Sequence, residues 1–250
     1  MTRTVVITGA SAGIGRALAL EFASRGWRLG LASRRLATLE LLREEIIATT
    51  GGTAPPPALL ELDVANTADC GARLGGFLES LGGVDVFVAN AGINEFTRIG
   101  QDSFDGSQRI LQTNLIGTLA TLELAATHFI AQGRGHLVGI SSLASLLPIP
   151  SQGAYCASKA ALSSWLGAAR IELARHGIAV TDVLPGFVVT DIMPNIERYP
   201  FAVPVERAAR EIVDAIGRRK RRAIVPGFPW RLLWRFAGLV PDAVWRRMLR

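Results

Sequence analysis

The chain has 250 residues, of which 49% are hydrophobic and 19% are charged, and these proportions are typical of a globular protein and exclude a disordered one. Its length fits one α/β domain with a substantial buried core. The formal net charge of +6 is uneven, because residues 218–250 hold ten basic residues against one acid, whereas residues 1–217 hold 17 basic and 20 acidic residues. The surplus of positive charge therefore belongs to the C-terminal segment.

The sequence contains no recognisable targeting segment or metal site. The N-terminal stretch MTRTVVITGA lacks the long apolar region and the cleavage site of a signal peptide, and no apolar run reaches the roughly 20 residues of a membrane-spanning helix. Cys70 and Cys156 form no metal-ligand cluster, and a disulfide between them is not expected. His128, His136 and His176 share no ligand spacing and are interpreted as packing or surface residues. We expect a cytoplasmic protein without a metal.

Short apolar runs alternate with longer helical patterns along the chain, which predicts repeated βα units and a doubly wound parallel sheet buried on both faces. Seven strands are expected, at residues 3–8, 28–33, 58–63, 84–89, 136–141, 178–184 and 223–225. Helices are expected at about residues 13–25, 35–50, 67–81, 103–132, 152–176 and 204–217. No linker interrupts this alternation, so a single domain is predicted.

A glycine-rich turn, TGASAGIG, follows the first strand and opens the first helix, with Gly9, Gly13 and Gly15 at its key positions. Glycines permit tight turns and the close approach of a pyrophosphate, while the N-terminus of a helix presents unpaired N–H groups and the positive end of its dipole. The turn therefore predicts a dinucleotide site on a Rossmann-type sheet, to which Ser11 and Ile14 also contribute.

The end of the second strand indicates which dinucleotide binds. An acid at this point hydrogen-bonds the adenosine ribose in NAD sites and repels a 2′-phosphate, but here the strand ends with Ser33 and Arg34. Arginine forks match phosphate oxygens. The sequence therefore favours NADP(H), with Ser33 and Arg34 at the cofactor. Arg35 is expected to face solvent.

Tyr155 and Lys159 lie four residues apart on a predicted helix and hence on one face of it. A cation beside a phenol stabilises the phenolate and lowers the pKa of the tyrosine, which makes it a usable general acid or base. Lys159 is one of two lysines in a chain that otherwise uses arginine 25 times, so a lysine at this spacing suggests a chemical requirement.

Four further motifs appear in order: ANAG at 89–92, NLIG at 114–117, GISS at 139–142 and PGFVVT at 185–190. Three of them follow the carboxyl end of a strand, where open parallel sheets bind ligands, and NLIG lies inside the long helix. Together with the glycine turn and the Tyr155–Lys159 pair, they resemble the short-chain dehydrogenase/reductase family from Thr8 to Thr190. The departures, Ala89 in ANAG and Cys156 after the tyrosine, change no proposed catalytic group.

The resemblance implies a role for each matching residue. The catalytic residues would be Asn114, Ser142, Tyr155 and Lys159. The cofactor would be held by Gly9, Ser11, Gly13, Ile14, Gly15, Ser33, Arg34, Asp63, Val64, Asn90, Ala91, Gly92, Tyr155, Lys159, Pro185, Gly186, Val188 and Thr190. Within this set Asp63 would lie by the adenine, Asn90 would support the central sheet and the ribose, and Thr190 would contact the nicotinamide carboxamide.

The mechanism implied by the resemblance is hydride transfer from NADPH to a carbonyl carbon. Tyr155 would donate a proton to the developing alkoxide, Ser142 would steady that oxygen, and Lys159 with a water held by Asn114 would resupply the proton. The predicted function is an NADP(H)-dependent oxidoreductase acting on an apolar ketone, aldehyde or secondary alcohol. Two alternatives stay open: an NAD-linked alcohol dehydrogenase, and a non-catalytic NADP(H)-sensing or scaffold protein.

Two segments beyond these motifs bear on substrate and partners. The stretch DIMPNIERYPFAVP after Thr190 is largely apolar and favours a hydrophobic carbonyl substrate, or it packs over the cofactor. Residues 1–217 are assigned to the NADP(H)-binding and catalytic domain, and residues 218–250 to its last strand and a basic, tryptophan-rich amphipathic extension. That extension is expected to pack on its own or a partner subunit, with peripheral membrane contact as the alternative and nucleic acid disfavoured. The resemblance also implies a homodimer or homotetramer.

Overall fold

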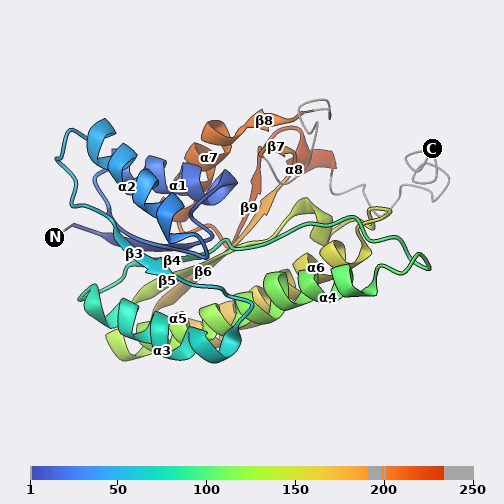
Figure 1. Cartoon of the computed structure of the whole chain (residues 1–250), viewed down its shortest axis with the longest axis horizontal. Coiled ribbons are helices and arrows are strands. Elements are labelled where there is room, and N and C mark those ends of the chain that lie inside the picture. Colours follow the sequence, from blue (N-terminus) through green and yellow to red (C-terminus); the bar gives the residue numbers. More distant parts are fainter. Residues whose placement is uncertain (1, 191–198, 200, 234–250) are drawn as a thin grey trace.

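The computed structural model describes residues 2–190, 199 and 201–233 and contains a seven-stranded parallel sheet (Figure 1). The strand order is β3-β2-β1-β4-β5-β6-β9, with every neighbouring pair parallel. The strands are β1 (Thr4–Thr8), β2 (Arg28–Ser33), β3 (Ala58–Glu61), β4 (Val86–Ala89), β5 (Gly135–Ile140), β6 (Ile178–Pro185) and β9 (Arg222–Val225). The predicted doubly wound sheet is confirmed, and each of its seven strands overlaps a predicted one.

Helices cover both faces of the sheet, as Figure 1 shows. On one face lie α1 (Gly13–Ser24), α2 (Leu36–Thr49) and α7 (Val205–Gly217); on the other lie α3 (Thr67–Ser80), α4 (Phe104–Leu111), α5 (Thr118–Gln132) and α6 (Gly153–Glu172). β1 and β4 are neighbours at the centre of the sheet, and the strand order reverses its direction between them. Ligands of such sheets bind at the carboxyl ends of the strands at this switch point.

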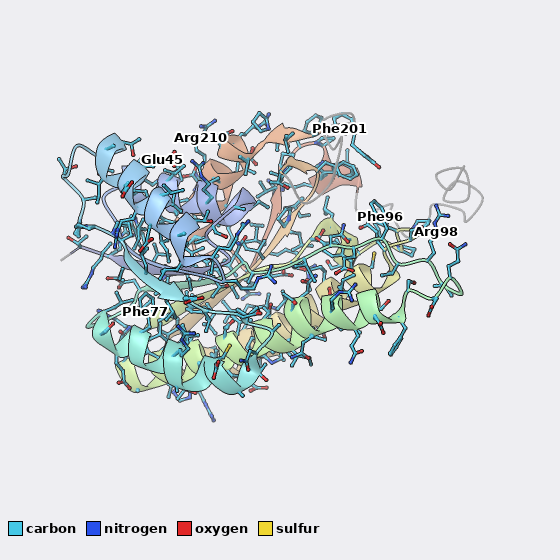
Figure 2. All side chains as sticks on the ribbon, in the orientation of Figure 1. Glu45, Phe77, Phe96, Arg98, Phe201 and Arg210 are labelled. Atoms are coloured by element: carbon cyan, nitrogen blue, oxygen red, sulfur yellow. The ribbon has the colours of Figure 1, made fainter. Side chains whose placement is uncertain are left out.

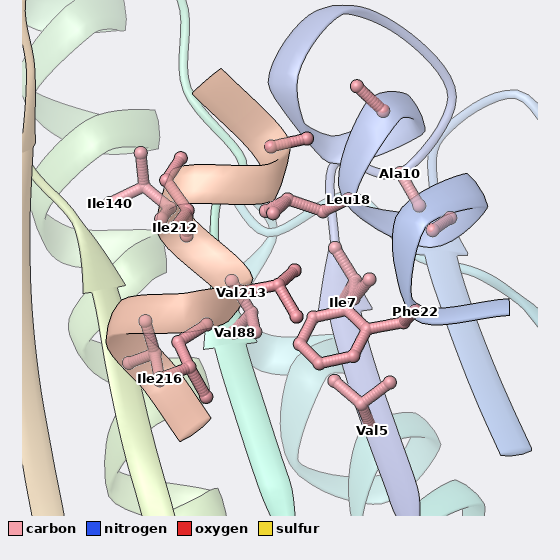
Figure 3. Packing of buried hydrophobic residues seen from close by; sticks show 14 of the residues in the cluster. Val5, Ile7, Ala10, Leu18, Phe22, Val88, Ile140, Ile212, Val213 and Ile216 are labelled. Carbon is pink, nitrogen blue, oxygen red and sulfur yellow. The ribbon is translucent and has the colours of Figure 1, made fainter. Parts of the chain in front are cut away.

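Two apolar cores, one on each face, hold the layers together. All five residues of β1 are buried, and its side chains alternate: Val5 and Ile7 join the core under α1 and α7, whereas Val6 joins the core over α3 and α5. Figure 3 shows the first of these cores, where Ile212 and Val213 of α7 pack beside the side chains of α1. The sheet is therefore buried on both sides, as its continuous apolar strands predict.

The predicted helix at 103–132 is interrupted. A π-helical segment, η1 (Gln112–Gly117), separates α4 from α5 and contains the NLIG motif. A Cβ at Gly117 would lie 2.3 Å from the backbone oxygen of Val64, so only glycine lets this turn approach the loop after β3. Likewise, the predicted helix at 152–176 ends as α6 at Glu172 and continues as the 3₁₀ turn η3 (Leu173–His176).

Four short elements complete the described chain, and the first of them is the 3₁₀ turn η2 (Leu143–Ser145), which follows β5. The strands β7 (Val188–Val189) and β8 (Val203–Pro204) pair in parallel beside the main sheet, and they were not predicted because each has only two residues. The helix α8 (Trp230–Leu233) is the described part of the predicted amphipathic extension, whose remainder lies outside the described residues. Within the described ranges, no helix combines the length and apolarity needed to cross a bilayer.

Candidate active site

A cavity of about 790 Å³ opens at the carboxyl ends of the central strands, where the loops after β1, β2, β4, β5 and β6 meet. All predicted site residues line this cavity except Gly15 and Asn114. Residues as far apart in the sequence as Gly9 and Thr190 thus face one space, because parallel strands end at the same edge of the sheet.

The glycine turn forms one wall of the cavity. Gly9 and Gly13 have positive φ angles, +65° and +53°, which glycine adopts without strain. A Cβ at Gly9 would lie 2.7 Å from the Cα of Ala91, and one at Gly15 would lie 2.3 Å from the backbone oxygen of Gly9. Gly15 therefore does not face the cavity; it lets α1 approach the turn closely.

The N-terminus of α1 points its free N–H groups at the cavity. Its N-cap residue, Ala12, provides no side-chain cap, and the first turn of the helix has no acidic residue. Ala12, Gly13 and Ile14 all line the cavity. Unpaired backbone N–H groups at the positive end of a helix dipole form a site for an anionic group such as a pyrophosphate.

Asn90 joins the first and fourth strands. Its side-chain nitrogen donates to the backbone oxygens of Thr8, at 3.0 Å, and Gly9, at 3.2 Å. In return the Thr8 hydroxyl accepts from the backbone nitrogens of Asn90 and Ala91, at 3.1 and 3.2 Å. These bonds fix the glycine turn against the ANAG loop at the switch point of the sheet.

Both arginines after β2 line the cavity. Nη2 of Arg35 donates to the Ser11 hydroxyl at 3.3 Å, and the backbone nitrogen of Arg35 donates to the Ser33 hydroxyl at the same distance. The expectation that Arg35 only faces solvent is therefore wrong: its side chain is exposed, but it reaches back to the glycine turn. Sequence position alone could not separate the two arginines, since both follow the strand end.

A smaller cavity of about 270 Å³ adjoins this end of the site. Arg34 lines both cavities, and the smaller one also contains Asp63 and a cation that the sequence analysis did not single out, Arg73 of α3. Asp63 accepts a hydrogen bond from the backbone nitrogen of Ala65 at 3.0 Å, which fixes its loop. This end of the site thus combines basic and acidic groups.

Lys159 is almost completely buried, at 5% exposed, and its Nζ donates to the backbone oxygen of Ile140 at 2.9 Å. Burial lowers the pKa of Lys159 to about 8, and the negative charge of Asp182 acts in the opposite direction. The same Nζ lies 5.8 Å from the centre of the Tyr155 ring. The i, i+4 spacing therefore brings the ammonium and the phenol to one end of the cavity, as predicted.

The surroundings of Tyr155 differ from the expectation in one respect. Burial raises the pKa of the phenol above its ordinary value, and the nearby Ser142 hydroxyl acts in the opposite direction. The lowering of this pKa that we expected from Lys159 does not dominate in the structure. The reason is that the Lys159 ammonium is bonded to the Ile140 oxygen rather than to the phenol.

The two serines of GISS have different surroundings. The Ser142 hydroxyl accepts from the backbone nitrogen of Ala144 at 3.0 Å, which orients it at the cavity wall beside Tyr155. The Ser141 hydroxyl is buried and donates to the backbone oxygen of Lys159 at 3.0 Å. Ser141 thereby ties the end of β5 to α6.

Behind Ser141 lies a buried polar chain that the sequence analysis missed. The Ser141 and Ser163 hydroxyls are 2.8 Å apart, and Oγ of Ser163 lies 3.3 Å from Oδ1 of Asp182. Asp182 is 2% exposed, and its other carboxylate oxygen is 3.3 Å from Nε of Arg222. No motif marks Ser163 or Asp182, so only the strand alternation that turns Asp182 inward could have indicated this chain.

Asn114 lies behind the cavity wall, in the π-helical segment η1. Its amide exchanges two hydrogen bonds with the backbone of Ile93: Nδ2 donates to the Ile93 oxygen at 2.8 Å, and Oδ1 accepts from the Ile93 nitrogen at 2.7 Å. A Cβ at Gly92 would lie 3.2 Å from Oδ1 of Asn114 and 3.6 Å from Nζ of Lys159. Gly92 therefore leaves room for Asn114 and Lys159 to approach each other. Single π turns are frequent at functional sites.

The end of the cavity beyond Tyr155 has aromatic walls. The ring of Phe187 is 4.7 Å from that of Tyr199 and 5.4 Å from that of Trp230, and all three residues line the cavity. Phe96, labelled in Figure 2, joins them from the loop after β4. Of the predicted apolar segment, Ile192, Met193 and Ile196 lie outside the described residues. Phe96 was missed, because nothing in its local sequence relates it to the site. Trp230 begins the predicted amphipathic extension but was not named as a site residue.

Comparisons with known proteins agree with this arrangement. The sequence model of the short chain dehydrogenase family matches residues 3–199. A protein of Myxococcus xanthus described as an uncharacterized oxidoreductase is 37% identical over 257 residues, which cover 98% of this chain and 97% of that protein.

Solved structures show the same fold. A short-chain dehydrogenase from Sphingobium yanoikuyae in complex with NADPH has a TM-score of 0.82 and 26% identity, covering 99% of this chain and 95% of its own. A short chain dehydrogenase/reductase from Burkholderia phymatum in complex with NAD has a TM-score of 0.82 and 24% identity, covering 95% of this chain and 93% of its own. With the ordered motifs gathered around one cavity, these matches establish that the chain belongs to the short-chain dehydrogenase/reductase family of oxidoreductases.

Proposed function

We propose that the protein is an NADP(H)-dependent oxidoreductase that interconverts an apolar ketone or aldehyde and the corresponding alcohol, with Tyr155 as the general acid or base. The observation that carries this proposal is the single cavity that holds the glycine turn at one end and Ser142, Tyr155 and Lys159 at the other. Carbonyl reduction requires a proton donor and a dinucleotide-binding site within one cavity.

The residues of the cavity fit a nicotinamide dinucleotide. The uncapped N-terminus of α1 and the positive-φ glycines suit the pyrophosphate. Arg34, Arg35 and the Ser11 hydroxyl would surround a 2′-phosphate, and the Sphingobium relative binds NADPH. When bound, the reduced cofactor supplies the hydride.

The chain's own residues supply the proton and hold the oxygen. Tyr155 donates its phenolic proton to the oxygen that gains charge as the carbonyl is reduced, and the Ser142 hydroxyl stabilises that oxygen by a hydrogen bond. The buried Lys159 ammonium favours the phenolate left on Tyr155. Asn114, held by both backbone groups of Ile93, keeps the loop beside Lys159 in place and is proposed to hold a water of the proton relay.

The aromatic walls formed by Phe96, Phe187, Tyr199 and Trp230 favour a substrate with an apolar body. We also propose that the protein acts as a homodimer or homotetramer. Exposed apolar side chains on α4 and α6 support this, namely Phe104, Leu111 and Ile171. Light scattering on the purified protein tests the assembly, and a monomer would contradict it.

The function is tested by titrating the purified protein with NADPH and NADH and then measuring cofactor oxidation with a panel of apolar ketones and aldehydes. We expect tighter binding of NADPH, turnover by the native chain, and a loss of at least about a hundredfold in kcat for Tyr155→Phe, since the proton donor is removed. Cys156→Ala is the matched control, because Cys156 is the next residue of the same helix but does not line the cavity.

Other outcomes would favour the alternatives. Near-normal turnover by Tyr155→Phe would refute the proposed role of the tyrosine. Tighter binding of NADH would favour the NAD-linked alcohol dehydrogenase. Tight NADPH binding without turnover of any carbonyl compound would favour the sensor or scaffold protein.

A further inference from the structure

The aromatic end of the cavity reaches the surface beside two segments that are distant in the sequence. In the loop after β4, Phe96 and Arg98 line the cavity and are themselves exposed, so the cavity opens to solvent beside them. The second segment is α8, where the lining residue Trp230 packs edge-to-face on the exposed ring of Phe201, at 6.0 Å. Figure 2 shows Phe96, Arg98 and Phe201 at the same end of the molecule.

Both segments expose large apolar side chains. Three of the four exposed phenylalanines of the described chain belong to them, namely Phe96, Phe201 and Phe228, which is 80% exposed in the turn before α8. Ile99 follows in the loop of Phe96 at 98% exposed, and Leu232 extends from α8 at 57%. These five residues are called the apolar rim. Single exposed apolar residues are ordinary, but a group of them that continues an apolar cavity marks a surface for a partner.

The backbone on both sides of the rim is held by hydrogen bonds to the body of the domain. In the loop after β4, the nitrogen of Thr97 donates to the oxygen of Ser151 at 2.8 Å, just before α6 begins. Before α8, the nitrogen of Gly227 donates to the carboxylate of Glu211 in α7 at 3.1 Å. The rim side chains therefore project from anchored segments.

The charges beside the rim favour an anionic partner. Arg98 is exposed between Phe96 and Ile99 in the sequence, and Arg231 precedes Leu232 in α8. The carboxylate of Glu95 accepts two hydrogen bonds from the guanidinium of Arg109, at 3.0 and 2.7 Å, which offsets its charge. A contact between two copies of the chain through the same rim would bring like charges together, since a two-fold interface uses one patch twice.

The sequence that follows α8 has the same character as the rim. Residues 234–250 contain two tryptophans, one phenylalanine and four arginines against a single aspartate. Arginines are attracted to the headgroups of anionic lipids, and aromatic and apolar side chains enter the boundary between headgroups and acyl chains. A bilayer surface that carries negative charge therefore matches both the apolar and the basic residues.

We propose that the apolar rim docks the opening of the cavity onto an anionic phospholipid bilayer, so that the substrate enters from the membrane. The substrate class is then a lipid-soluble ketone, aldehyde or alcohol with a long apolar chain. The nature of that substrate rests on the proposed function, whereas the docking does not. The basic cluster at 218–222 is not part of this surface, because it leads into β9 at the amino edge of the parallel sheet, opposite the cavity.

The docking is tested by sedimenting the full chain with vesicles of phosphatidylcholine and with vesicles of equal parts phosphatidylcholine and phosphatidylglycerol. We expect binding to the anionic vesicles, and a fall of at least about tenfold in the partition constant when Ile99→Ser, Phe228→Ser and Leu232→Ser are combined, because three apolar groups no longer leave water. None of the three lines the cavity, so the affinity of this triple variant for NADPH should equal that of the native chain.

Leu41→Ser is the matched control. Leu41 is 67% exposed, comparable to Leu232, but it belongs to α2 and does not line the cavity. This variant should bind the anionic vesicles as the native chain does. An equal loss of vesicle binding in Leu41→Ser and in the triple variant would overturn the role of the rim.

Other results would also overturn the proposal. Vesicle binding that is unchanged in the triple variant would move the contact to another surface, such as the cluster at 218–222. Equal binding to both kinds of vesicle would refute the choice of an anionic bilayer. Absence of vesicle binding, with a smaller assembly of the triple variant in light scattering, would assign the rim to a second copy of the chain. Vesicle binding lost only in the triple variant, without turnover of any carbonyl compound by the native chain, would support the docking and contradict the proposed function.

Discussion

The ammonium group of Lys159 donates a 2.9 Å hydrogen bond to the backbone oxygen of Ile140, the last residue of β5. The Ser141 hydroxyl returns a bond of 3.0 Å to the backbone oxygen of Lys159. These two bonds join the helix that carries Tyr155 to the strand end that carries Ser142. The distance between the two hydroxyls proposed to act on the substrate oxygen is thus set by the lysine side chain as well as by packing.

Lys159 is expected to lower the stability of the native protein while serving its function. Burial lowers the pKa of Lys159 from 10.5 to about 8, so near neutral pH the folded state carries a poorly solvated charge. Between about 8 and 10.5 the unfolded chain binds a proton that the folded chain has lost, and this contribution to stability rises with pH.

Replacing Lys159 by Met should therefore stabilise the fold near neutral pH by about 1–2 kcal/mol. This gain is smaller than the free energy that corresponds to the whole pKa shift, because the Ile140 oxygen loses its hydrogen-bond donor. The same variant should lose turnover. Urea unfolding of both proteins measures the difference in the free energy of unfolding, which should shrink as the pH is raised toward 10.5. A less stable variant at neutral pH would show that the hydrogen bond outweighs the cost of burying the charge.

Asp182 is expected to influence the pH dependence of the reaction through Lys159. It is the acidic residue whose charge raises the pKa of Lys159, against the larger effect of burial. Its own pKa is raised by burial and lowered by Arg222, Ser163 and Arg170. Asp182→Asn removes the charge but keeps the shape, so the Lys159 pKa should fall. The limb of the kcat/KM profile that reflects loss of the Lys159 proton should then move to lower pH.

Ser163→Ala is the control for this effect, since it removes the hydroxyl between Ser141 and Asp182 but keeps the carboxylate of Asp182 and its partner Arg222. Its pH profile should remain where that of the native protein lies. Equal displacement in both variants would mean that Asp182 acts by positioning α6 rather than by its charge.

The preference for NADPH is expected to depend on both arginines after β2. Arg35→Ala removes a guanidinium that already donates to the Ser11 hydroxyl, and we expect the Kd of NADPH to rise about tenfold to a hundredfold while that of NADH changes little. Arg34→Ala should act in the same direction. Fluorescence titration measures both constants, with Arg210→Ala as the control, because Arg210, labelled in Figure 2, is exposed on α7 and lines neither cavity. A similar loss for both cofactors would contradict phosphate recognition.

The sequence predicts those parts of the site that follow a strand directly. Apolar runs such as VVIT locate a buried strand, and the turn or motif after it must then lie at the carboxyl edge of the sheet. For this reason the amino-acid sequence is sufficient to assign Gly9, Asn90, Ser142 and Pro185 to one cavity. The position of each motif directly after a strand is what locates it, because all strands of a parallel sheet end at the same edge.

The residues that were missed reach the site by packing instead. Phe96 enters the wall from a segment with no motif, Trp230 enters it from the predicted extension, and Asp182 of β6 meets Ser163 of α6. The π turn at Asn114 depends on the contact of Gly117 with the Val64 backbone, which is distant in sequence. Local sequence patterns do not predict such contacts, because the contacts depend on how two elements that are distant in the sequence pack against each other.

His136 gives the protein a predictable sensitivity to acid. The side chain is 3% exposed, and burial, aided by the charge of Arg219, lowers its pKa from 6.5 to about 4. Its Nε2 lies 2.8 Å from the Thr181 hydroxyl, which itself donates to the backbone oxygen of Lys220 at 2.6 Å. Since Thr181 uses its proton for Lys220, the neutral imidazole donates from Nε2 and links β5, β6 and the turn before β9.

Between about pH 6.5 and pH 4 the unfolded chain protonates this histidine while the folded chain resists, so stability falls as the pH falls through this window, by up to about 3 kcal/mol. His136→Gln keeps a donor toward Thr181 but does not titrate, and its stability should fall less steeply over the same range. Urea unfolding at several pH values compares the two slopes. Parallel pH dependences of the native protein and His136→Gln would assign the acid sensitivity to other groups.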